Sequence, residues 1–547
     1  SPIFFQDLFN VVPDWVGSNI IIGGDLNLIL DPILDRQHPQ SNSFKNRESL
    51  KTLLQSHNMV DIWRLLYPDG REYSYFSAVH KSYSRIDYFL LDSRLLASVS
   101  SCKYHNIHIS DHAPVLLNLK LDFKKGRQSW RLNNALLKEK EFVSYISDEI
   151  KSFLNSNDKG DVDDSMLWEA MKAVIRGCII SFEAAKCKES KLRLDEIDDL
   201  LTTLENAYKL KHSPDILNKI TTLRYEYNSI MSRNVSKLLV QVKQRYFELG
   251  DKPHKLLARQ LKQTQASRAI HRIKLEDGTL LTDPDKINDC FADFYTSVYQ
   301  SQGKLDIENM DRFFESLNLP KLPSDSAEAL EVNITLQEIV SVISTLPNNK
   351  APGPDGFSVE FFKVFSSKLS PLLLRMLNHS KQAARLPPTL YRANISLIPK
   401  PGRDPEVVTS YRPISLLPLE TKILGKILAN RLKKHICLII HPDQTGFMPG
   451  RHMFFNLRRL FNILYSNHSK ESIVVSLDAQ RAFDQVEWPY MMYVLKKFGF
   501  GPLFTDWIEI IYSHPTASVI TNQNISRPFA IHRGTRQGCP LSPFLFS

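Results

Sequence analysis

Residues Arg533-Gly534-Thr535-Arg536-Gln537-Gly538-Cys539-Pro540-Leu541-Ser542-Pro543 are the stretch of this sequence that decides the fold. Gly538 lets the backbone approach a ligand closely, and Gln537 offers an amide for hydrogen bonding. Arg533 and Arg536 supply guanidinium donors that suit phosphate groups. An ordinary basic turn is the alternative, but the combination of glycine, amide and two arginines favours a loop that contacts a phosphorylated ligand.

A second informative run lies upstream of this loop. Ile473-Val474-Val475-Ser476-Leu477-Asp478 is rich in β-branched residues and predicts a strand that ends in a carboxylate. A nucleotidyl transferase needs a carboxylate at such a strand end to hold Mg²⁺, so Asp478 is a candidate catalytic and metal-binding residue. Phe483, in the following run Ala479–Asp484, is placed to lie against the incoming sugar and exclude a 2′-hydroxyl. A buried strand followed by a turn is the alternative for this run alone.

These two runs resemble motifs A and B of reverse transcriptases. Four upstream segments resemble the fingers of that family and the segment before motif A: 349–356 (NKAPGPDG), 396–402 (SLIPKPG), 411–416 (YRPISL) and 444–451 (QTGFMPGR). The resemblance implies that Phe483, Gln537, Gly538 and Arg533 contact the nucleotide. It makes Lys400 and Arg412 candidates for triphosphate or template contacts, although both could simply flank proline-rich turns.

The same resemblance defines what is missing after motif B. Reverse transcriptases complete their metal site with two adjacent aspartates in a Tyr/Phe-x-Asp-Asp hairpin, and the sequence to Ser547 contains none. Phe291-Ala292-Asp293-Phe294 lies before motif A and has Phe at its fourth position, and Asp198-Asp199 lie within a helical pattern. Asp478 alone cannot hold two metal ions, so we expect this chain to bind nucleic acid with little or no polymerisation.

Polar side chains also follow predicted strands at three places near the N-terminus: 22–27 (IGGDLN), 84–88 (SRIDY) and 109–115 (ISDHAPV). Hydrolysis of a phosphodiester needs a carboxylate-held metal, a base for water, a donor to the phosphoryl oxygens and an orienter for an imidazole. An Asx-turn or a structural histidine is the alternative for each place alone. The ordered set favours a hydrolytic site whose candidates are Asp25, Asn27, Asp87, Asp111 and His112.

Residues 1–120 resemble the endonuclease/exonuclease/phosphatase superfamily in its apurinic-endonuclease-like branch. The resemblance implies the C-terminal part of a four-layer α/β sandwich. Asp25 would activate water, Asn27 would contact the scissile phosphate, and His112 would stabilise charge on phosphorus. Asp111 would orient His112 and serve as a metal ligand, and Asp87 would orient or support the pair. The Asn and metal-binding Glu that the family carries further upstream have no match in the 24 residues before Asp25, so we expect cleavage to lack its main metal ligand.

Residues 121–275 are expected to form a helical linker between two such domains. One apolar stripe is followed, after Pro214, by another, which predicts two helices paired as a hairpin. The stripes are Leu192, Ile197, Leu200, Leu204, Tyr208 and then Ile216, Ile220, Leu223, Tyr227, Ile230, Leu238, Val242.

The end of this linker is strongly basic. Residues 233–274 hold eleven Lys and Arg against two acids, which is typical of a binder of phosphate backbones. A solvated helix face is the alternative. With Tyr246 and Phe247 interleaved, the stretch is expected to bind RNA or a primer–template duplex, and its candidates are Arg233, Lys237, Lys243, Arg245, Lys255, Arg259 and Lys262.

The composition of the chain disfavours several classes of protein. The 547 residues carry 69 Lys and Arg against 59 Asp and Glu, a net charge of +10. Six cysteines at scattered positions form neither a C-x-x-C pair nor a zinc-ligand pattern, so a disulfide scaffold and a structural zinc are disfavoured. No run of eighteen apolar residues occurs. The first residues, Ser1-Pro2-Ile3-Phe4, do not resemble a secretory signal, and we expect the chain to begin and end within a longer protein.

The chain thus shows an endonuclease-like part, then a basic helical linker, then a reverse-transcriptase-like part. The last part covers 276–547 and would comprise fingers and a partial palm. This order resembles the second-open-reading-frame polyprotein of non-LTR (long interspersed) retrotransposons, most closely that of the L1-like clade. The resemblance implies RNA-directed DNA polymerase and target-DNA-nicking activities, with Mg²⁺ or Mn²⁺ as cofactor. Implied partners are target DNA, the element RNA and dNTPs, without a membrane, in the nucleus and, with element RNA, the cytoplasm. Alternatives are an inactive relic, a nucleic-acid-binding module without catalysis, and a cellular repair endonuclease, which leaves residues 275–547 unexplained.

Overall fold

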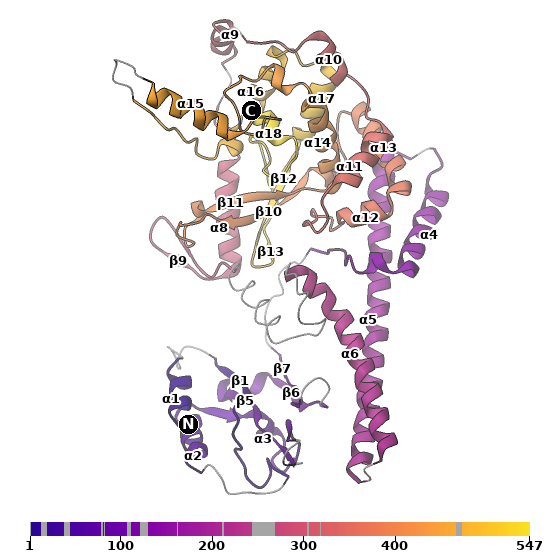
Figure 1. Cartoon of the computed structure of the whole chain (residues 1–547), viewed down its shortest axis with the longest axis vertical. Coiled ribbons are helices and arrows are strands. Elements are labelled where there is room, and N and C mark those ends of the chain that lie inside the picture. Colours follow the sequence, from indigo (N-terminus) through magenta and orange to yellow (C-terminus); the bar gives the residue numbers. More distant parts are fainter. Residues whose placement is uncertain are drawn as a thin grey trace. The chain divides into compact units, whose positions relative to one another are not determined.

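The protein is described by a computed structural model that mixes helices and strands in two compact units (Figure 1). Unit 1 comprises residues 1–125 and 185–255, and unit 2 comprises residues 126–184 and 256–547. Only the backbone is described for 44, 209–210 and 233–242. The described residues are 2–11, 19–37, 44–77, 80, 82–106, 111–120, 129–160, 162–210, 213–242, 269–303, 306–317, 319–466 and 473–547. None of the helices in these ranges is both long and apolar enough to span a membrane.

Unit 1 is built on a three-stranded antiparallel sheet in the order β1-β5-β2, with two hairpins, β3-β4 and β6-β7. Its strands are β1 (Ile21–Asp25), β2 (Met59–Asp61), β3 (Tyr75–Ser77), β4 (Ser82–Ser84), β5 (Asp87–Asp92), β6 (Val99–Tyr104) and β7 (Val115–Leu119). Its first helices are α1 (Pro2–Asn10), α2 (Phe44–Ser56), α3 (Ile62–Leu66) and the short η1 (Ser93–Ser98).

The central strand β5 separates two apolar layers of unit 1. Successive side chains of a strand point to opposite faces, and both Leu90 and Leu91 are fully buried. Leu90 packs with Phe5 and other side chains of α1 and α2, whereas Leu91 packs with Trp63 of α3 and Cys102 of β6. The sheet therefore carries a helical layer on one face and the β6-β7 hairpin on the other.

A buried ion pair fixes the loop that leads into β5. Arg85 is fully buried, and its guanidinium donates to both oxygens of Asp35 and both oxygens of Asp61. It also lies over the rings of Trp63 and Tyr88, at 5.0 and 4.6 Å from their centroids. Because a buried charge is tolerated only when it is paired and hydrogen-bonded, this network fixes the backbone two residues before the candidate site residue Asp87.

Two long helices form the hairpin expected around Pro214. They are α5 (Asp164–Leu210) and α6 (Pro214–Val242), and they share a core that contains Ile197, Leu201 and Ile220. The predicted stripe is wrong at two positions, since Leu192 is 55% exposed and Leu200 is 47% exposed, whereas Leu201 is fully buried. Residues 197, 201, 204 and 208 follow the spacing of one helix face, and residue 200 lies about 100° away from 201.

Unit 2 contains a five-stranded sheet in the order β11-β10-β12-β13, with β14 also paired to β12. Strand β10 runs antiparallel to β11 and parallel to β12. The segments 396–402 and 411–416, which resemble the fingers of reverse transcriptases, overlap β10 and coincide with β11. The strands are β10 (Arg392–Pro399), β11 (Tyr411–Leu416), β12 (Thr516–Thr521), β13 (Asn524–Ile525) and β14 (Phe529–Ala530), and a separate pair is β8 (Ile273–Lys274) and β9 (Leu280–Leu281).

Helices enclose this sheet. They include α4 and the start of α5, which lie within the expected linker 121–275 and pack into the core of unit 2 through Phe142, Ile146 and Trp168. The helices are α4 (Lys140–Asn157), α8 (Pro284–Val298), α9 (Ile307–Glu315), α10 (Ser324–Leu330), α11 (Leu336–Thr345), α12 (Val359–Val364), α13 (Ser366–Gln382), α14 (Leu419–Leu432), α15 (Met453–Tyr465), α16 (Trp488–Lys497), α17 (Pro502–Tyr512) and α18 (Ser542–Phe546), with short turns η2 (Leu136–Lys138), η3 (Pro388–Tyr391), η4 (Val408–Ser410), η5 (Ile436–Leu438) and η6 (Ala482–Gln485).

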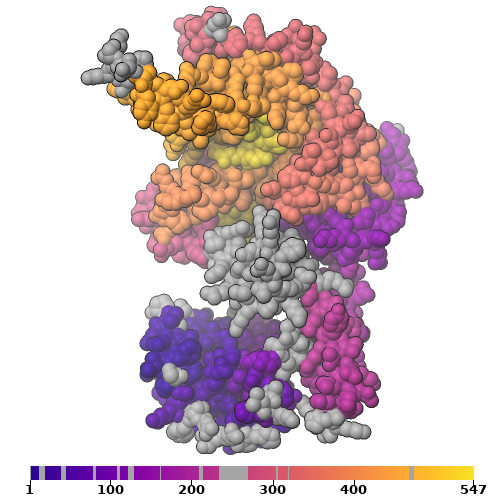
Figure 2. Space-filling model, in the orientation of Figure 1, coloured from indigo at the N-terminus to yellow at the C-terminus, as the bar shows by residue number. Residues whose placement is uncertain are grey.

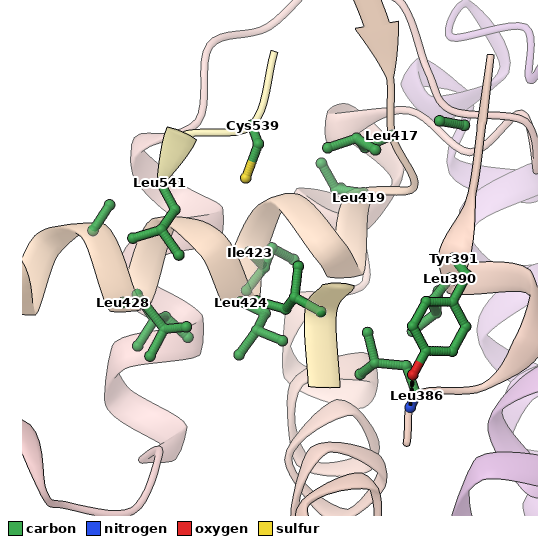
Figure 3. Close-up of a cluster of buried hydrophobic side chains, with 14 of the residues drawn as sticks. Leu386, Leu390, Tyr391, Leu417, Leu419, Ile423, Leu424, Leu428, Cys539 and Leu541 are labelled. Atoms are coloured by element: carbon green, nitrogen blue, oxygen red, sulfur yellow. Dashed lines mark hydrogen bonds between the residues drawn. The ribbon is translucent and has the colours of Figure 1, made fainter. Parts of the chain in front are cut away.

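The end of the chain is part of the core of unit 2. In Figure 2 the C-terminal residues, in yellow, lie recessed between neighbouring orange segments. Cys539 and Leu541 are buried beside α14, in the same cluster as Ile423 and Leu424 (Figure 3). An added Cβ on Gly425 of α14 would lie 3.1 Å from the Cys539 sulfur, so α14 and the 533–543 loop are in close contact. This packing holds one end of the loop in place.

The segment 349–356 connects the start of α5 to α14. Lys172 lies between the carboxylates of Asp355 and Glu420, and the Trp168 indole also donates to Glu420 at 2.9 Å. Burial lowers the pKa of Lys172, but the two carboxylates outweigh burial and hold that pKa above its usual value. A Cβ on Gly356, where φ is +82°, would meet the Trp130 carbonyl oxygen at 2.2 Å. The segment 349–356 therefore links the start of α5 to α14 through packing and ion pairs.

The strand predicted over 473–478 is wrong. These residues form no strand, and the side chains of Ile473 and Leu477 are 89% and 91% exposed. A β-strand is stabilised by hydrogen bonds to a neighbouring strand and by burial of one face. No strand within the described ranges pairs with this run, so its β-branched composition does not suffice.

Lys172→Met is expected to destabilise unit 2 by about 3–5 kcal/mol, because it leaves the buried Glu420 carboxylate and the partly buried Asp355 carboxylate without a cation. Tryptophan fluorescence in a urea titration measures the change. Lys151→Met, at an exposed position of α4, is the matched control and is expected to change stability by less than about 0.5 kcal/mol. Equal effects of the two substitutions would contradict a stabilising role for the ion pairs of Lys172 with Asp355 and Glu420.

Candidate functional site

Unit 1 gathers polar side chains at the end of β1. The Asp25 carboxylate accepts from the Asn27 backbone at 2.8 Å and from its side-chain amide at 3.1 Å. Asn27 has φ of 48°, a left-handed conformation that asparagine tolerates. In the β1-β5 register Asp25 lies directly opposite Asp87, so the two carboxylates come from neighbouring strands. Asp25 and Asn27 are both exposed to solvent.

His112 joins this group through Asp87. Its Nδ1 lies 2.8 Å from Oδ2 of Asp87, and both side chains are partly buried. The Ser74 hydroxyl accepts from the Asp87 backbone, and the Tyr104 hydroxyl donates to the Asp87 carbonyl at 2.7 Å. The loop before β7 and the start of β5 are thus held together around the imidazole.

Of the two carboxylates that the sequence offered to orient His112, only one lies at the ring. Asp87, rather than Asp111, makes the hydrogen bond to the His112 ring. The Asp111 carbonyl accepts from the Phe76 backbone, and its side chain is exposed. Neighbouring residues in an extended segment point to opposite sides, which separates the Asp111 carboxylate from the imidazole. The sequence signal that favours Asp87 is its place at the start of a strand that pairs with β1.

The arrangement in unit 1 has the elements of general acid–base chemistry. A carboxylate at a ring nitrogen fixes the orientation of an imidazole, which can then take or give a proton at Nε2. Among the described residues, however, no group of three or more His, Cys, Asp or Glu side chains could hold a metal ion. Neither Asp111 nor Asp478, the metal ligands predicted from the sequence, therefore belongs to a complete metal site there.

In unit 2 the runs that resemble motifs A and B are in direct contact. The Thr535 backbone donates to the Phe483 carbonyl at 2.6 Å, and the Gly534 backbone donates to the Val486 carbonyl at 2.7 Å. A Cβ on Gly534 would lie 2.8 Å from the Asp484 carbonyl oxygen, so only glycine permits this approach. Segments about fifty residues apart in sequence thereby form one surface.

The other side of the motif B loop contacts β11. The Ser415 backbone donates to the Gln537 carbonyl at 2.8 Å. Gly538 has φ of +116°, and an added Cβ would lie 2.6 Å from the Ser415 carbonyl oxygen. The loop is thus held between the turn at 483–486 and β11, while Gly538 itself is exposed.

Asp484 lies at the centre of this contact. It is 2% exposed, and its carboxylate accepts from the Tyr299 hydroxyl at 3.1 Å and from the Gln537 amide nitrogen at 3.0 and 3.2 Å. Burial raises the pKa of this carboxyl to about 6, although the hydrogen bonds from Tyr299 and Gln537 act in the opposite direction. The carboxylate therefore remains mostly ionised at neutral pH.

Four cations gather around the same turn. Lys400 follows β10, and its amine donates to the Thr409 carbonyl at 2.8 Å. Burial and the positive charges of Arg481, Arg403 and Arg412 lower the pKa of Lys400. Arg412 lies opposite Ile398 in the β10-β11 register and is exposed. Mutual repulsion of this kind is relieved by a polyanion such as a triphosphate.

Aromatic rings surround Phe483, the predicted sugar contact. Its ring stacks on Phe546 with centroids 4.4 Å apart, and Phe447 meets it edge-on at 5.7 Å. A cleft of about 920 Å³ adjoins the turn and is lined by Ala479 and Gln480 of the motif A run, by α9 and by Phe546. Asp478, one residue before the cleft lining, is exposed and has no strand beneath it.

Arg533 and Arg536 differ from the expectation of phosphate donors, since both are 5% exposed. The Arg533 guanidinium donates to the Val298 carbonyl at 2.9 Å and lies 3.4 Å from Glu487. Arg536 lies among tyrosines and Cys539, and burial lowers its pKa. Arg533 is thus held by neighbouring parts of the protein, whereas none of the three Arg536 guanidinium nitrogens has a hydrogen-bond partner among the described residues.

Three contributors to the unit 2 site were missed from the sequence. Asp484 and Arg481 lie within the motif A run, and Tyr299 comes from the end of α8, 185 residues before Asp484. A buried acid next to Phe483 is a signal that could have pointed to Asp484, whereas nothing local indicates Tyr299. The predicted nucleic-acid-binding residues cannot be placed: only the backbone of Arg233 and Lys237 is described, and Lys243, Arg245, Lys255, Arg259 and Lys262 lie outside the described residues.

Comparison with known proteins shows which families share these motifs. Residues 398–547 match the family model of reverse transcriptases (RNA-dependent DNA polymerases). Over 533 residues, 96% of the chain, the sequence is 28% identical to the transposon TX1 uncharacterized 149 kDa protein of Xenopus laevis. It is 32% identical over 218 residues, 39% of the chain, to the RNA-directed DNA polymerase from mobile element jockey of Drosophila melanogaster.

The matched part is a minority of each relative's length. The chain spans 40% of the TX1 protein and 24% of the jockey protein. The crystal structure of the AP endonuclease LMAP from Leishmania major is 31% identical over 18% of this chain and 35% of that chain, with a TM-score of 0.17. The reverse transcriptase match over residues 398–547 and the transposon relatives show that this chain is similar to the polyproteins of non-LTR retrotransposons.

Proposed function

We propose that unit 2 binds an RNA template, a DNA primer and a deoxynucleotide as part of an RNA-directed DNA polymerase. The observation that carries the proposal is the hydrogen-bonded contact between the motif A turn and the motif B loop, through Phe483, Asp484 and Gln537. The sugar would lie against Phe483, and the triphosphate would lie near Lys400 and Arg412. The relatives named as RNA-directed DNA polymerases support this assignment.

The chain's own residues perform binding and orientation in this proposal. Lys400 and Arg412 neutralise phosphate charge, Phe483 excludes a 2′-hydroxyl, and Gln537 holds the sugar side of the nucleotide. Mg²⁺ or Mn²⁺ is expected by resemblance, but Asp478 belongs to no metal-binding group among the described residues. Binding without catalysis by this chain is therefore part of the proposal, and synthesis of DNA belongs to the longer polyprotein.

We assign the nicking of target DNA to residues 1–120, as the remnant of a four-layer α/β sandwich. The support is the convergence of Asp25, Asn27, Asp87 and His112 from β1, β5 and the loop before β7. A nick in chromosomal DNA would supply the primer end for copying of the element RNA. This role implies action in the nucleus, with element RNA also bound in the cytoplasm.

The test of polymerase function is formation of a ternary complex. Residues 1–547 are titrated into a fluorescent RNA–DNA primer–template whose primer has a blocked 3′ end. The correct dNTP, with Mg²⁺ present, is expected to tighten binding about tenfold relative to a mismatched dNTP, a difference of about 1.4 kcal/mol. Equal binding with correct and mismatched dNTPs would contradict the proposal.

Lys400→Ala and Arg412→Ala are each expected to reduce this nucleotide-dependent tightening about fivefold or more, because each removes a charged donor to phosphate. Lys286→Ala, at an exposed position of α8, is the matched control and is expected to leave the tightening unchanged. Fluorescence anisotropy at fixed salt measures all three, since phosphate contacts weaken as salt rises. A loss of the same size in the control would point to general electrostatics.

Gly538→Ala is expected to abolish the preference for the correct dNTP. The new Cβ would clash with the Ser415 carbonyl oxygen in a left-handed backbone conformation, so the loop must shift. Gly278→Ala is the matched control, because Gly278 also has a positive φ, of +86°, but has open space around its Cβ position. Retention of the preference in Gly538→Ala, measured by the same anisotropy titration, would be inconsistent with the loop forming the site.

Any Mg²⁺-dependent nicking by residues 1–547 is expected to fall about 10²–10⁴-fold with His112→Ala, the usual effect of losing a general acid–base group. Conversion of supercoiled plasmid to open circles measures the rate. His80→Ala is the control, since His80 is exposed. Nicking that survives His112→Ala would assign the activity to other residues.

A further inference from the structure

An asparagine just after β6 binds the long helix α5. The Asn106 side-chain amide donates to the Thr202 hydroxyl at 2.8 Å and to the Asp198 carbonyl at 3.1 Å. An amide nitrogen carries two hydrogens, so both bonds form at once. The Thr202 hydroxyl gives its own hydrogen to the Asp198 carbonyl at 2.8 Å, which leaves its oxygen as the acceptor for Asn106. Beside Asn106, Nδ1 of His105 lies 4.0 Å from the Asp198 carboxylate.

The packing of α5 sets the direction of these two groups. Residues 198 and 202 are about one turn apart, so they share a face of the helix. Each follows a core residue by one position, since Ile197 and Leu201 are buried against Ile220 of α6. Pairing of α5 with α6 therefore determines which way Asp198 and Thr202 point.

The same helical hairpin also faces β4. Burial and the charge of Glu205 on α5 raise the pKa of Tyr83. Glu205 is paired with Arg224 of α6 at 2.8 Å, and the Arg224 charge acts on Tyr83 in the opposite direction. Because both charges reach the Tyr83 ring, the bond from Asn106 belongs to a wider contact of the helices with this part of unit 1.

The segment 104–106 also supports both members of the Asp87–His112 pair. The Tyr104 hydroxyl donates to the Asp87 carbonyl at 2.7 Å. The backbone of the next residue donates at 2.9 Å to the carbonyl of Pro114, two residues after His112. The Asp87 carboxylate in turn lies 2.8 Å from Nδ1 of His112. A restraint on this segment is therefore also a restraint on the imidazole and its carboxylate.

We propose that α5, through the contact of Thr202 with Asn106, positions the imidazole of His112 for nicking. The inference rests on the nicking function proposed for residues 1–120 and adds to it a role for the linker helix. Thr202 and Asn106 touch no substrate in this account, so they are positioning residues. Loss of their contact loosens the segment that holds the imidazole, and general acid–base catalysis depends on the orientation of that ring.

Thr202→Val tests the contact from the side of the helix. Valine keeps the branched shape but removes the acceptor for Asn106. Hydrogen–deuterium exchange in peptides covering 111–119 of residues 1–547 is expected to become about fivefold faster, the effect of about one lost hydrogen bond. The NMR signal of the His112 ring, from protein labelled with ¹³C at histidine Cε1 and assigned with His112→Ala, is expected to shift.

Thr203→Val is the matched control. Thr203 is exposed on the same turn of α5, and its hydroxyl donates to the Asp199 carbonyl just as that of Thr202 donates to the Asp198 carbonyl. Its substitution is expected to leave both the exchange and the His112 signal unchanged. Equal exchange rates and equal His112 signals in Thr202→Val and Thr203→Val would overturn the inference.

Asn106→Ala tests the contact from the other side. Its effects are expected to equal those of Thr202→Val, and the double variant is expected to add nothing, because both substitutions remove one interaction. Additive effects would overturn the inference. Any nicking by Thr202→Val is expected to show kcat lowered about fivefold with KM unchanged. Absence of nicking by the longer polyprotein would instead overturn the proposed function, and the two cases are distinguishable because exchange and NMR need no nicking.

Discussion

The contact between two short loops, far apart in sequence, is the constraint on which unit 2 depends. Backbone hydrogen bonds from Gly534 and Thr535 reach the carbonyls of Val486 and Phe483, and the Asp484 carboxylate binds the Gln537 amide from within. A buried carboxylate is stable only when its acceptor atoms are satisfied, so the partners of Asp484 are held in place with it. The proposed sugar contact and the candidate amide thereby share one rigid base.

Packing beyond this contact extends the constraint through unit 2. Cys539 and Leu541 anchor the loop to α14, and Glu420 of α14 binds Lys172 of α5 together with Asp355. The helix that precedes the reverse transcriptase match in sequence is therefore part of the same core. In unit 1, the buried Arg85 network plays the part that the Asp484 contact plays in unit 2, because it fixes the start of β5 and with it Asp87.

Local patterns predicted those features that local physics determines. Apolar periodicity around Pro214 indicated the helical hairpin, and the runs at 396–402 and 411–416 indicated the paired strands β10 and β11. The strand expected at 473–478 failed because β-propensity does not supply a partner strand. Arg533 resembled a phosphate donor, but its exposure is set by packing against Val298 and Glu487. The hydrogen bonds of Tyr299 to Asp484 and of Asp87 to His112 are tertiary contacts that no local pattern encodes.

The central claim is that the motif A turn and the motif B loop form one rigid base. Hydrogen–deuterium exchange of residues 1–547, read by mass spectrometry in peptides covering 481–488 and 533–538, tests it most directly. Both peptides are expected to exchange as slowly as the paired strand β10, and peptides covering 473–478 are expected to exchange within seconds. Rapid exchange of 533–538, at the rate of 473–478, would contradict the account.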